Sequence, residues 1–230
     1  MLNFSKNFCL YTPWQKHNVC AGITTRTYEG LNVRADISDV FKNLKISLPE
    51  QNIIYLKQIH SAIIQTVNTS YKTILEGDGL ITTQQNVCIV IKTADCVPVF
   101  IFHPKTKTAC LLHVGWRSAY ARIIPEALNL LNLQANELEV FIGPCLRQEC
   151  FTVQEDFLEN IIFRPFIFKQ DNTLKFNIIK FIFQELISKK IPLSNIYDSG
   201  ICSSCSNDKF FSHRKETGSK LRTLSFIYLK

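Results

Sequence analysis

Short apolar runs bounded by polar corners recur along most of the chain. The runs at 87–91, 97–102 and 108–112 are rich in valine, isoleucine, leucine and phenylalanine, a composition typical of buried strands. The same kind of pattern predicts further strands at 19–25, 53–56, 62–67, 80–83, 138–142, 195–201 and 223–229. The chain is therefore expected to be built mainly from short strands.

Apolar residues at helical spacing are found in four segments. They predict helices at 36–48, 117–131, 153–162 and 176–188. Pro125 argues against an unbroken helix in the second segment, unless that helix begins late and holds the proline in its first turn. Strands and helices do not alternate strictly, which favours an α+β fold with two layered sheets covered by helices.

Length and composition restrict the class of protein. The 230 residues suit one domain or two tightly joined halves, and 46% of them are hydrophobic. No run approaches the roughly 18–20 apolar residues of a membrane span, and the first residues lack the features of a signal peptide. Nine cysteines without a regular spacing indicate reduced thiols, so we expect a cytoplasmic protein.

The net charge of +7 is partly concentrated near one end of the sequence. Residues 205–230 hold six lysines and arginines against two acidic residues. Such a cluster suits a phosphate-bearing small molecule, an anionic lipid surface or nucleic acid, or it is an ordinary solvated face. No nucleic-acid-binding motif and no membrane span accompany it, so we expect neither nucleic acid nor a membrane as partner.

Two histidines and a cysteine lie where apolar runs meet polar corners. They are His60, Cys96 and His113, separated by 36 and 17 residues, and neighbouring strand ends can bring them together. Imidazole and thiolate are preferred zinc ligands, and three protein ligands with one open position are typical of a catalytic site. The spacing matches no short metal motif. Two alternatives therefore stay open. Cys96 is a small buried apolar side chain, and His113 caps the end of a strand.

The same atoms could instead form a nucleophilic site. Cys96 would react as a thiolate activated by His113 or His60, and Asp95 could orient the imidazole. The residue types are the same in both hypotheses, so the sequence alone does not separate them.

A second pair of thiols, Cys202 and Cys205, has C-x-x-C spacing. A structural zinc knuckle would need a second such pair, which the sequence lacks, and the flanking residues do not predict the helix start of a thioredoxin-like motif. We interpret the two cysteines as loop thiols.

Three arginines near predicted strand ends are candidates for binding an anionic substrate. Arg26 and Arg117 each follow a predicted strand, and Arg214 lies in a polar loop. A guanidinium fork suits phosphate or carboxylate. For Arg214 an exposed charged hairpin tip is an equally good explanation.

Seven short segments then occur together in chain order. They are GITTR (22–26), QIHS (58–61), GDGLIT (77–82), TADCVPV (93–99), HVGWR (113–117), IGP (142–144) and FFSHR (210–214). In this combination the chain resembles the YfiH-like proteins, also called the laccase-domain or polyphenol oxidase family and the peptidoglycan editing factors. Each segment is weak by itself, but together they span nearly the whole chain.

The resemblance implies a single domain over 1–230 with a four-layer αββα sandwich, in which two packed mixed sheets are flanked by helices. It also implies a zinc-dependent purine nucleoside phosphorylase that acts on adenosine, inosine, guanosine and methylthioadenosine and deaminates adenosine. Purine nucleoside and phosphate are then the expected ligands. His60, Cys96 and His113 match the family's zinc ligands. Deamination of adenosine also needs a proton shuttle, which the resemblance does not assign. Asp95 and Asp78 are the candidates for it.

The sequence also departs from the family. Ser118 stands where glycine is usual, so we expect its side chain to narrow the site. The segment after Arg26 is short and poor in glycine, which removes part of a loop expected near the nucleoside. Two other functions remain possible, namely a cysteine hydrolase acting on peptidoglycan-type amide bonds and a catalytically silent purine-binding protein. Copper-dependent phenol oxidation is not favoured, because three ligands do not make the several copper sites of a multicopper oxidase.

Overall fold

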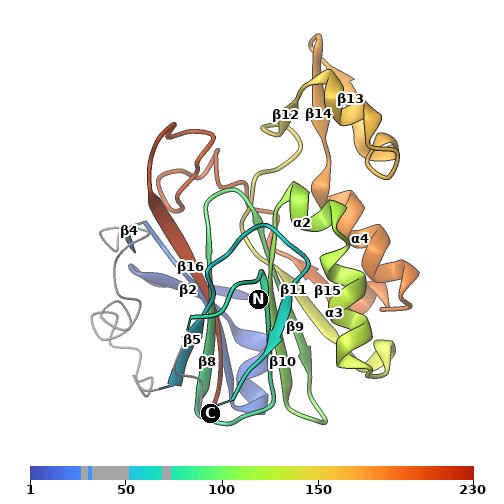
Figure 1. Cartoon of the computed structure of the whole chain (residues 1–230). Coiled ribbons are helices and arrows are strands. Elements are labelled where there is room, and N and C mark those ends of the chain that lie inside the picture. The colour runs from blue at the N-terminus through green and yellow to red at the C-terminus, as the bar shows by residue number, and fades with distance from the viewer. Residues whose placement is uncertain (27–30, 33–51, 69–73) are drawn as a thin grey trace.

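Two mixed β-sheets pack face to face in the computed structural model of the protein, which describes residues 1–26, 31–32, 52–68 and 74–230 (Figure 1). The first sheet has seven strands, and β5 runs parallel to β8 while the other pairs are antiparallel. In spatial order its strands are β1 (Leu2–Phe4), β2 (Phe8–Tyr11), β3 (Val19–Thr24), β16 (Leu221–Leu229), β8 (Val87–Thr93) and β5 (Ile53–Tyr55), with β4 (Leu31–Asn32) also paired to β16.

The second sheet has six strands and is also mixed, with parallel pairs at both edges. In spatial order its strands are β15 (Ile196–Asp198), β11 (Glu139–Ile142), β9 (Val97–His103), β10 (Thr108–Val114), β7 (Gly79–Thr82) and β6 (Ile64–Thr66). A small third sheet projects beyond one end of the sandwich (Figure 1). It consists of β12 (Thr152–Val153), β14 (Thr173–Phe176) and β13 (Ile167–Gln170).

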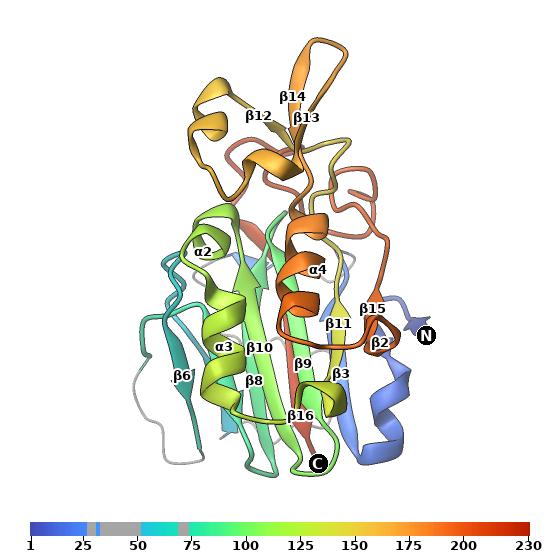
Figure 2. The same ribbon diagram turned by 90° about the vertical axis from the view of Figure 1, so that its right-hand side faces the viewer.

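Helices cover the outer face of the six-stranded sheet (Figure 2). They are α2 (Trp116–Tyr120), α3 (Ile123–Leu131) and α4 (Ile178–Ser188). The segment predicted as one helix at 117–131 is divided at Arg122, whose backbone is left-handed with φ 67°. Pro125 lies in the first turn of α3, where its missing N–H costs nothing. The late-starting helix is thus confirmed.

The predicted helix at 153–162 is wrong in its extent. Residues Glu155–Glu159 form only a short 3₁₀ turn, η4, and the segment before it joins the small sheet as β12. The Phe157 ring packs against Phe163 and Phe176, and these tertiary contacts override the helical spacing. Further 3₁₀ turns in the described residues are η1 (Thr12–His17), η3 (Ala135–Glu137), η5 (Arg164–Phe166) and η6 (Leu193–Asn195).

The core of the described residues has one cluster between the sheets, one under the helices and a smaller third one on the other face of the seven-stranded sheet, because side chains alternate across each strand. Phe100 and Phe102 of β9 point between the sheets, whereas Val99 and Ile101 pack under the helices. Between the sheets, the rings of Tyr11 and Phe141 stack with centroids 4.5 Å apart.

The α+β class and the two packed mixed sheets are confirmed, while the helix predicted at 36–48 lies outside the described residues. In the described part of the chain, none of the helices combines the length and the apolar character needed to cross a bilayer.

Candidate metal centre

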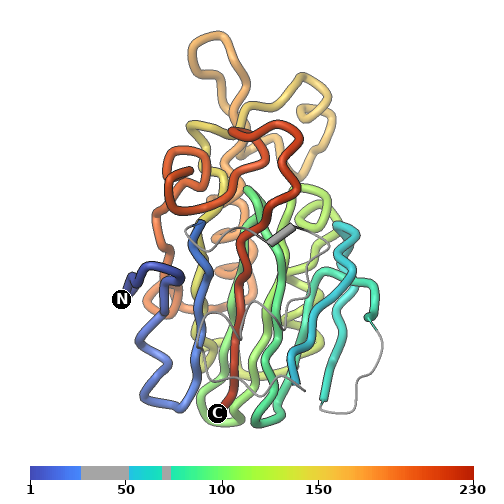
Figure 3. The backbone as a smooth tube through the Cα atoms, turned by 90° about the vertical axis from the view of Figure 1, so that its left-hand side faces the viewer, coloured from blue at the N-terminus to red at the C-terminus, as the bar shows by residue number. Residues whose placement is uncertain are grey.

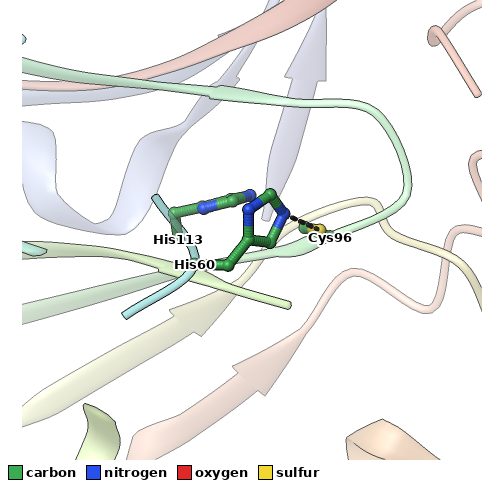
Figure 4. Close-up of side chains that lie close together, drawn as sticks. All are labelled: His60, Cys96 and His113. Carbon is green, nitrogen blue, oxygen red and sulfur yellow. Dashed lines mark hydrogen bonds between the residues drawn. The ribbon is translucent and has the colours of Figure 1, made fainter. Parts of the chain in front are cut away.

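His60, Cys96 and His113 meet at one rim of the sandwich (Figure 4). His60 follows β5 of one sheet, Cys96 lies in the turn from β8 to β9, and His113 belongs to β10 of the other sheet. One ligand atom from each lies within 4.8 Å of the other two. The Cys96 Sγ is 3.9 Å from the His60 Nε2, and the two imidazole rings are 4.8 Å apart. The structure therefore brings together the three residues that the sequence singled out.

The backbone around the cluster is tightly arranged. His60 and Asp95 have left-handed backbones, with φ 59° and 89°. A Cβ at Gly115 would lie 3.0 Å from the Cys96 Sγ and 3.0 Å from the His60 Cδ2. Glycine at 115 thus lets the start of α2 approach the cluster closely.

A buried carboxylate holds His113 in place. The His113 Nδ1–H donates to the Asp78 Oδ1 at 2.8 Å, which leaves Nε2 as the ring nitrogen available to the cluster. The Asp78 Oδ2 accepts from the Ser61 N–H at 2.6 Å and from the Ser61 Oγ at 2.8 Å. Burial raises the pKa of Asp78, but these hydrogen bonds lower it overall, so the carboxylate is ionised.

The protein environment favours the thiolate form of Cys96. Burial raises the pKa of this thiol, but His113 and His60 lower it to about 6. Burial lowers the pKa of His113, whereas the Cys96 thiolate and Asp78 raise it to about 9. Without a metal the two groups therefore form a thiolate–imidazolium pair. Thiolate is the form that metal coordination and nucleophilic attack both require.

The donor set fits a zinc ion. One sulfur and two imidazole nitrogens are borderline-soft donors, and three protein ligands leave a fourth position open. The hydrogen bond from His113 to Asp78 is the kind of contact that fixes the ring of a zinc-bound histidine.

A cavity of about 1100 Å³ opens above the cluster. Its walls combine aromatic rings with cationic side chains. The aromatic residues are Tyr55, Trp116 and Phe151, and the cationic ones are Lys57, Lys92, Arg117, Arg214 and Arg222. The Arg117 guanidinium lies over the Trp116 ring, 4.2 Å from its centroid. Such a surface suits a ligand with a flat ring and an anionic group.

The three predicted arginines have different positions. Arg117 and Arg214 line the cavity. Arg26 is absent from the described residues that line it, and its Nη2 instead donates to the Glu216 Oε1 at 2.6 Å. Arg26 therefore anchors the loop that contains Glu216.

Asp95 lines the cavity, and both of its carboxylate oxygens accept hydrogen bonds. Its Oδ1 accepts from the Ser203 Oγ at 2.7 Å, and its Oδ2 accepts from the Arg214 N–H at 2.6 Å. Asp95 thus joins the turn that carries Cys96 to the loops around 203 and 214.

Arg222 is a cavity residue that the sequence reasoning missed. It lies in β16, and its Nη1 donates to the carbonyls of Ser219 and Leu221. Burial lowers its pKa, opposed by the negative charges of Cys96 and Asp95. Its position next to a predicted strand, shortly after the 210–214 segment, was the available signal.

Ser118 does not narrow the cavity. It is fully buried within α2 and is not among the described residues that line the cavity. The expected effect of this substitution is therefore not seen. The short segment after Arg26 lies mostly outside the described residues.

Comparison with known families gives a match over residues 15–230 to the family described as multi-copper polyphenol oxidoreductase laccase. A protein of Clostridium acetobutylicum named purine nucleoside phosphorylase is 31% identical over 202 residues, covering 84% of each chain. A protein of an unknown prokaryotic organism named adenosine deaminase RL5 is 25% identical over 206 residues, covering 81% of this chain and 79% of its own.

Solved structures share the fold over almost the whole chain. The hypothetical protein YfiH of Bacillus licheniformis superposes with a TM-score of 0.89 at 24% identity, covering 100% of this chain and 99% of its own. YlmD of Geobacillus stearothermophilus superposes with a TM-score of 0.88 at 24% identity, covering 99% and 98%. The YfiH-like fold expected from the sequence is thus confirmed.

Proposed function

The chain belongs to the multi-copper polyphenol oxidoreductase laccase family, and from this premise we propose that it is a zinc-dependent purine nucleoside phosphorylase that also deaminates adenosine. The observation that carries the proposal is the His60–Cys96–His113 cluster, set in a cavity lined by aromatic rings and cations. The names of the relatives support purine nucleosides as the substrate class. Adenosine, inosine, guanosine and methylthioadenosine are the proposed substrates.

The aromatic walls bind the nucleoside. A purine has two flat faces, and Tyr55, Trp116 and Phe151 offer rings on which such a face can stack. The cavity of about 1100 Å³ is large enough for a nucleoside together with phosphate.

The cationic walls bind phosphate. Arg117, Arg214 and Arg222 each carry five N–H donors, so the bonds that the last two make to backbone carbonyls leave further donors for an anion. In phosphorolysis a phosphate oxygen attacks C1′ of the ribose and the bond from C1′ to the base nitrogen breaks. Its electron pair goes to the purine, which takes up a proton, and fixed cations stabilise the charge on the phosphate.

Zinc, when bound by His60, Cys96 and His113, supplies a Lewis acid that polarises an oxygen of the substrate or of water. Asp78 keeps the His113 ring oriented and is committed to that bond and to Ser61. Among the described residues that line the cavity, Asp95 carries a carboxylate and Asp78 is absent, so we assign proton transfer to Asp95.

Product analysis tests the proposal. Purified protein is incubated with adenosine, with and without phosphate, and its bound metal is measured. We expect adenine and ribose 1-phosphate only when phosphate is present, and inosine in either case. Cys96→Ser should abolish both reactions. Cys20→Ser is the matched control, because Cys20 lies at the opposite end of its sheet, paired with Tyr228. If the zinc-loaded protein binds adenosine but forms no product, it is a purine-binding protein and the proposal is wrong.

The thiolate–imidazolium pair favours a second candidate, a cysteine hydrolase acting on peptidoglycan-type amide bonds. In this arrangement Cys96 is the nucleophile, His113 is the base, and Asp78 orients the His113 ring. Iodoacetamide separates the two candidates. A zinc-ligating thiolate should be alkylated only after chelation of zinc, whereas a free nucleophile should react at the same rate with or without a chelator.

A further inference from the structure

Three further cysteines, none of them part of the first cluster, lie together. Cys202 and Cys205 occupy the C-x-x-C loop, and Cys150 comes from the segment between β11 and β12. One sulfur from each lies within 4.8 Å of the other two, and the Sγ atoms of Cys150 and Cys205 are 3.4 Å apart. These residues, called the three-cysteine cluster below, are not used by the proposed function.

The spacing of the sulfurs suits coordination to one ion. A Zn–S bond of about 2.3 Å and a tetrahedral angle place two sulfurs of the same ion about 3.8 Å apart. All three sulfurs lie within 4.8 Å of one another, a limit that includes this value, and the 3.4 Å between Cys150 and Cys205 is well beyond the ~2.05 Å of a disulfide bond. Cys205 is exposed and the other two thiols are partly exposed, so an ion can reach them from solvent.

The loop is already held in a ligand-binding form. The Ser203 N–H donates to the Cys145 carbonyl at 2.9 Å, and the Cys145 N–H donates to the Ile201 carbonyl at 3.2 Å. The backbone on both sides of Cys202 is thus fixed by hydrogen bonds.

We propose that Cys150, Cys202 and Cys205 form a second metal site, which binds a thiophilic ion, Zn²⁺ or Cu⁺, through three thiolates. Thiolates select these two ions over harder cations. Zn²⁺ takes its fourth ligand from solvent, whereas Cu⁺ is satisfied by the three sulfurs. Binding releases the thiol protons to solvent and involves no change of oxidation state.

The second site is linked to the cavity through one carboxylate. Ser203, which lies between two of the ligands, donates to Asp95, the neighbour of Cys96. Arg214 donates from its side chain to the carbonyl of Cys150 and from its backbone to Asp95. An ion on the three-cysteine cluster thus fixes the loops that position Asp95 and Arg214.

Metal stoichiometry tests the proposal. Protein is purified under argon with a phosphine reductant, loaded with Zn²⁺ or with Cu⁺, desalted and analysed by inductively coupled plasma mass spectrometry. We expect two ions per wild-type chain, and two for the control Cys20→Ser. Cys205→Ser and Cys150→Ser should each lose one ion, as should Cys96→Ser, which removes a ligand of the other site. The metal retained most strongly in competition identifies the preferred ion.

Cobalt gives a readout that does not depend on activity. Absorption from sulfur to Co²⁺ charge transfer scales with the number of bound thiolates, so Cys96→Ser should keep most of it and Cys205→Ser much less. Circular dichroism checks that each variant is folded. The proposal is overturned if Cys205→Ser binds as many ions as wild type. If the His60–Cys96–His113 cluster binds no metal but the three-cysteine cluster does, the wild type and Cys96→Ser will each hold one ion.

Discussion

The two clusters of ligands in this protein are held by different means. His60, Cys96 and His113 come from the ends of strands in both sheets, and the fully buried Asp78 fixes one of the rings. The three-cysteine cluster sits on loops, and its Cys205 is exposed. The first site is therefore set by the packing of the sheets before any ion binds. In the three-cysteine cluster, backbone hydrogen bonds fix the loop that carries Cys202 and Cys205. A bound ion would connect this loop to Cys150.

The largest expected effect distinguishes the first cluster, which we propose to be catalytic, from the three-cysteine cluster. His113→Ala should lower kcat/KM for adenosine by more than about 100-fold, since changing only a partner of a metal ligand already costs about 10- to 100-fold. Cys202→Ala, in the three-cysteine cluster, should change it by less than about tenfold, because that site acts only through the loops. Steady-state assays of both variants decide this. Equal losses would mean that the two clusters work as one centre.

Asp78→Asn tests whether the first site depends on its buried carboxylate. The amide keeps the size of the side chain, but it cannot accept all the hydrogen bonds that His113 and Ser61 now donate. Zinc affinity should fall by about 10- to 100-fold. Competition with a chelating dye measures it, and Asp208→Asn, at an exposed position, should behave as wild type. An unchanged affinity would show that the sheets alone position the ring.

The substitution Arg222→Gln tests whether the cavity binds phosphate, and it leaves the metal ligands unchanged. Loss of one charge-assisted hydrogen bond costs about 1.5–3 kcal/mol, so the KM for phosphate should rise by at least about tenfold. The KM for adenosine should change much less. Arg164→Gln is the matched control, because that arginine is exposed and bonded to the carbonyl of Leu158. Parallel increases in both KM values would argue against a phosphate role.

The smallest effect concerns how the loop after the C-x-x-C pair is held. Arg26, by its side-chain hydrogen bond, lowers the pKa of Glu216 to about 2, although burial opposes this. A lowered folded-state pKa stabilises the protein above the unfolded-state value, and this stabilisation is lost as pH falls from about 4.5 to about 2. Glu216→Gln should cost about 1 kcal/mol at pH 7 and nothing near pH 2. Urea unfolding at both pH values measures the difference, and an equal cost at both would exclude the ion pair as its cause.

The sequence predicted the strands and the first cluster well, because both depend on local pattern. Runs of β-branched and aromatic residues mark buried strands such as β8, β9 and β10, and polar corners at their ends mark His60 and Cys96. The short edge strand β1 was missed, because its side chains are largely exposed and carry little periodic signal. β13, which is also largely exposed, was missed for the same reason.

What the sequence could not give was the pairing of loops that are distant along the chain. The C-x-x-C pair was interpreted as two loop thiols, because Cys150 lies 55 residues before Cys205 and only the tertiary fold brings it near. Arg222 likewise gave no signal apart from its place next to a strand. Asp78 was a candidate proton shuttle, and its burial beneath His113 became visible only in the structure.

The position of β16 has a consequence for how the protein is made on the ribosome. This strand fills the middle of its sheet, between β3 and β8 (Figure 3). Leu224 of β16 donates to the hydroxyl of Thr24, a residue synthesised 200 positions earlier. At about 5–20 residues per second, β3 has to wait roughly 10–40 s for its partner, with its edge open to wrong pairing. Arg222 arrives with the same strand, so a nascent chain acquires its full cationic cavity only once this late segment has emerged.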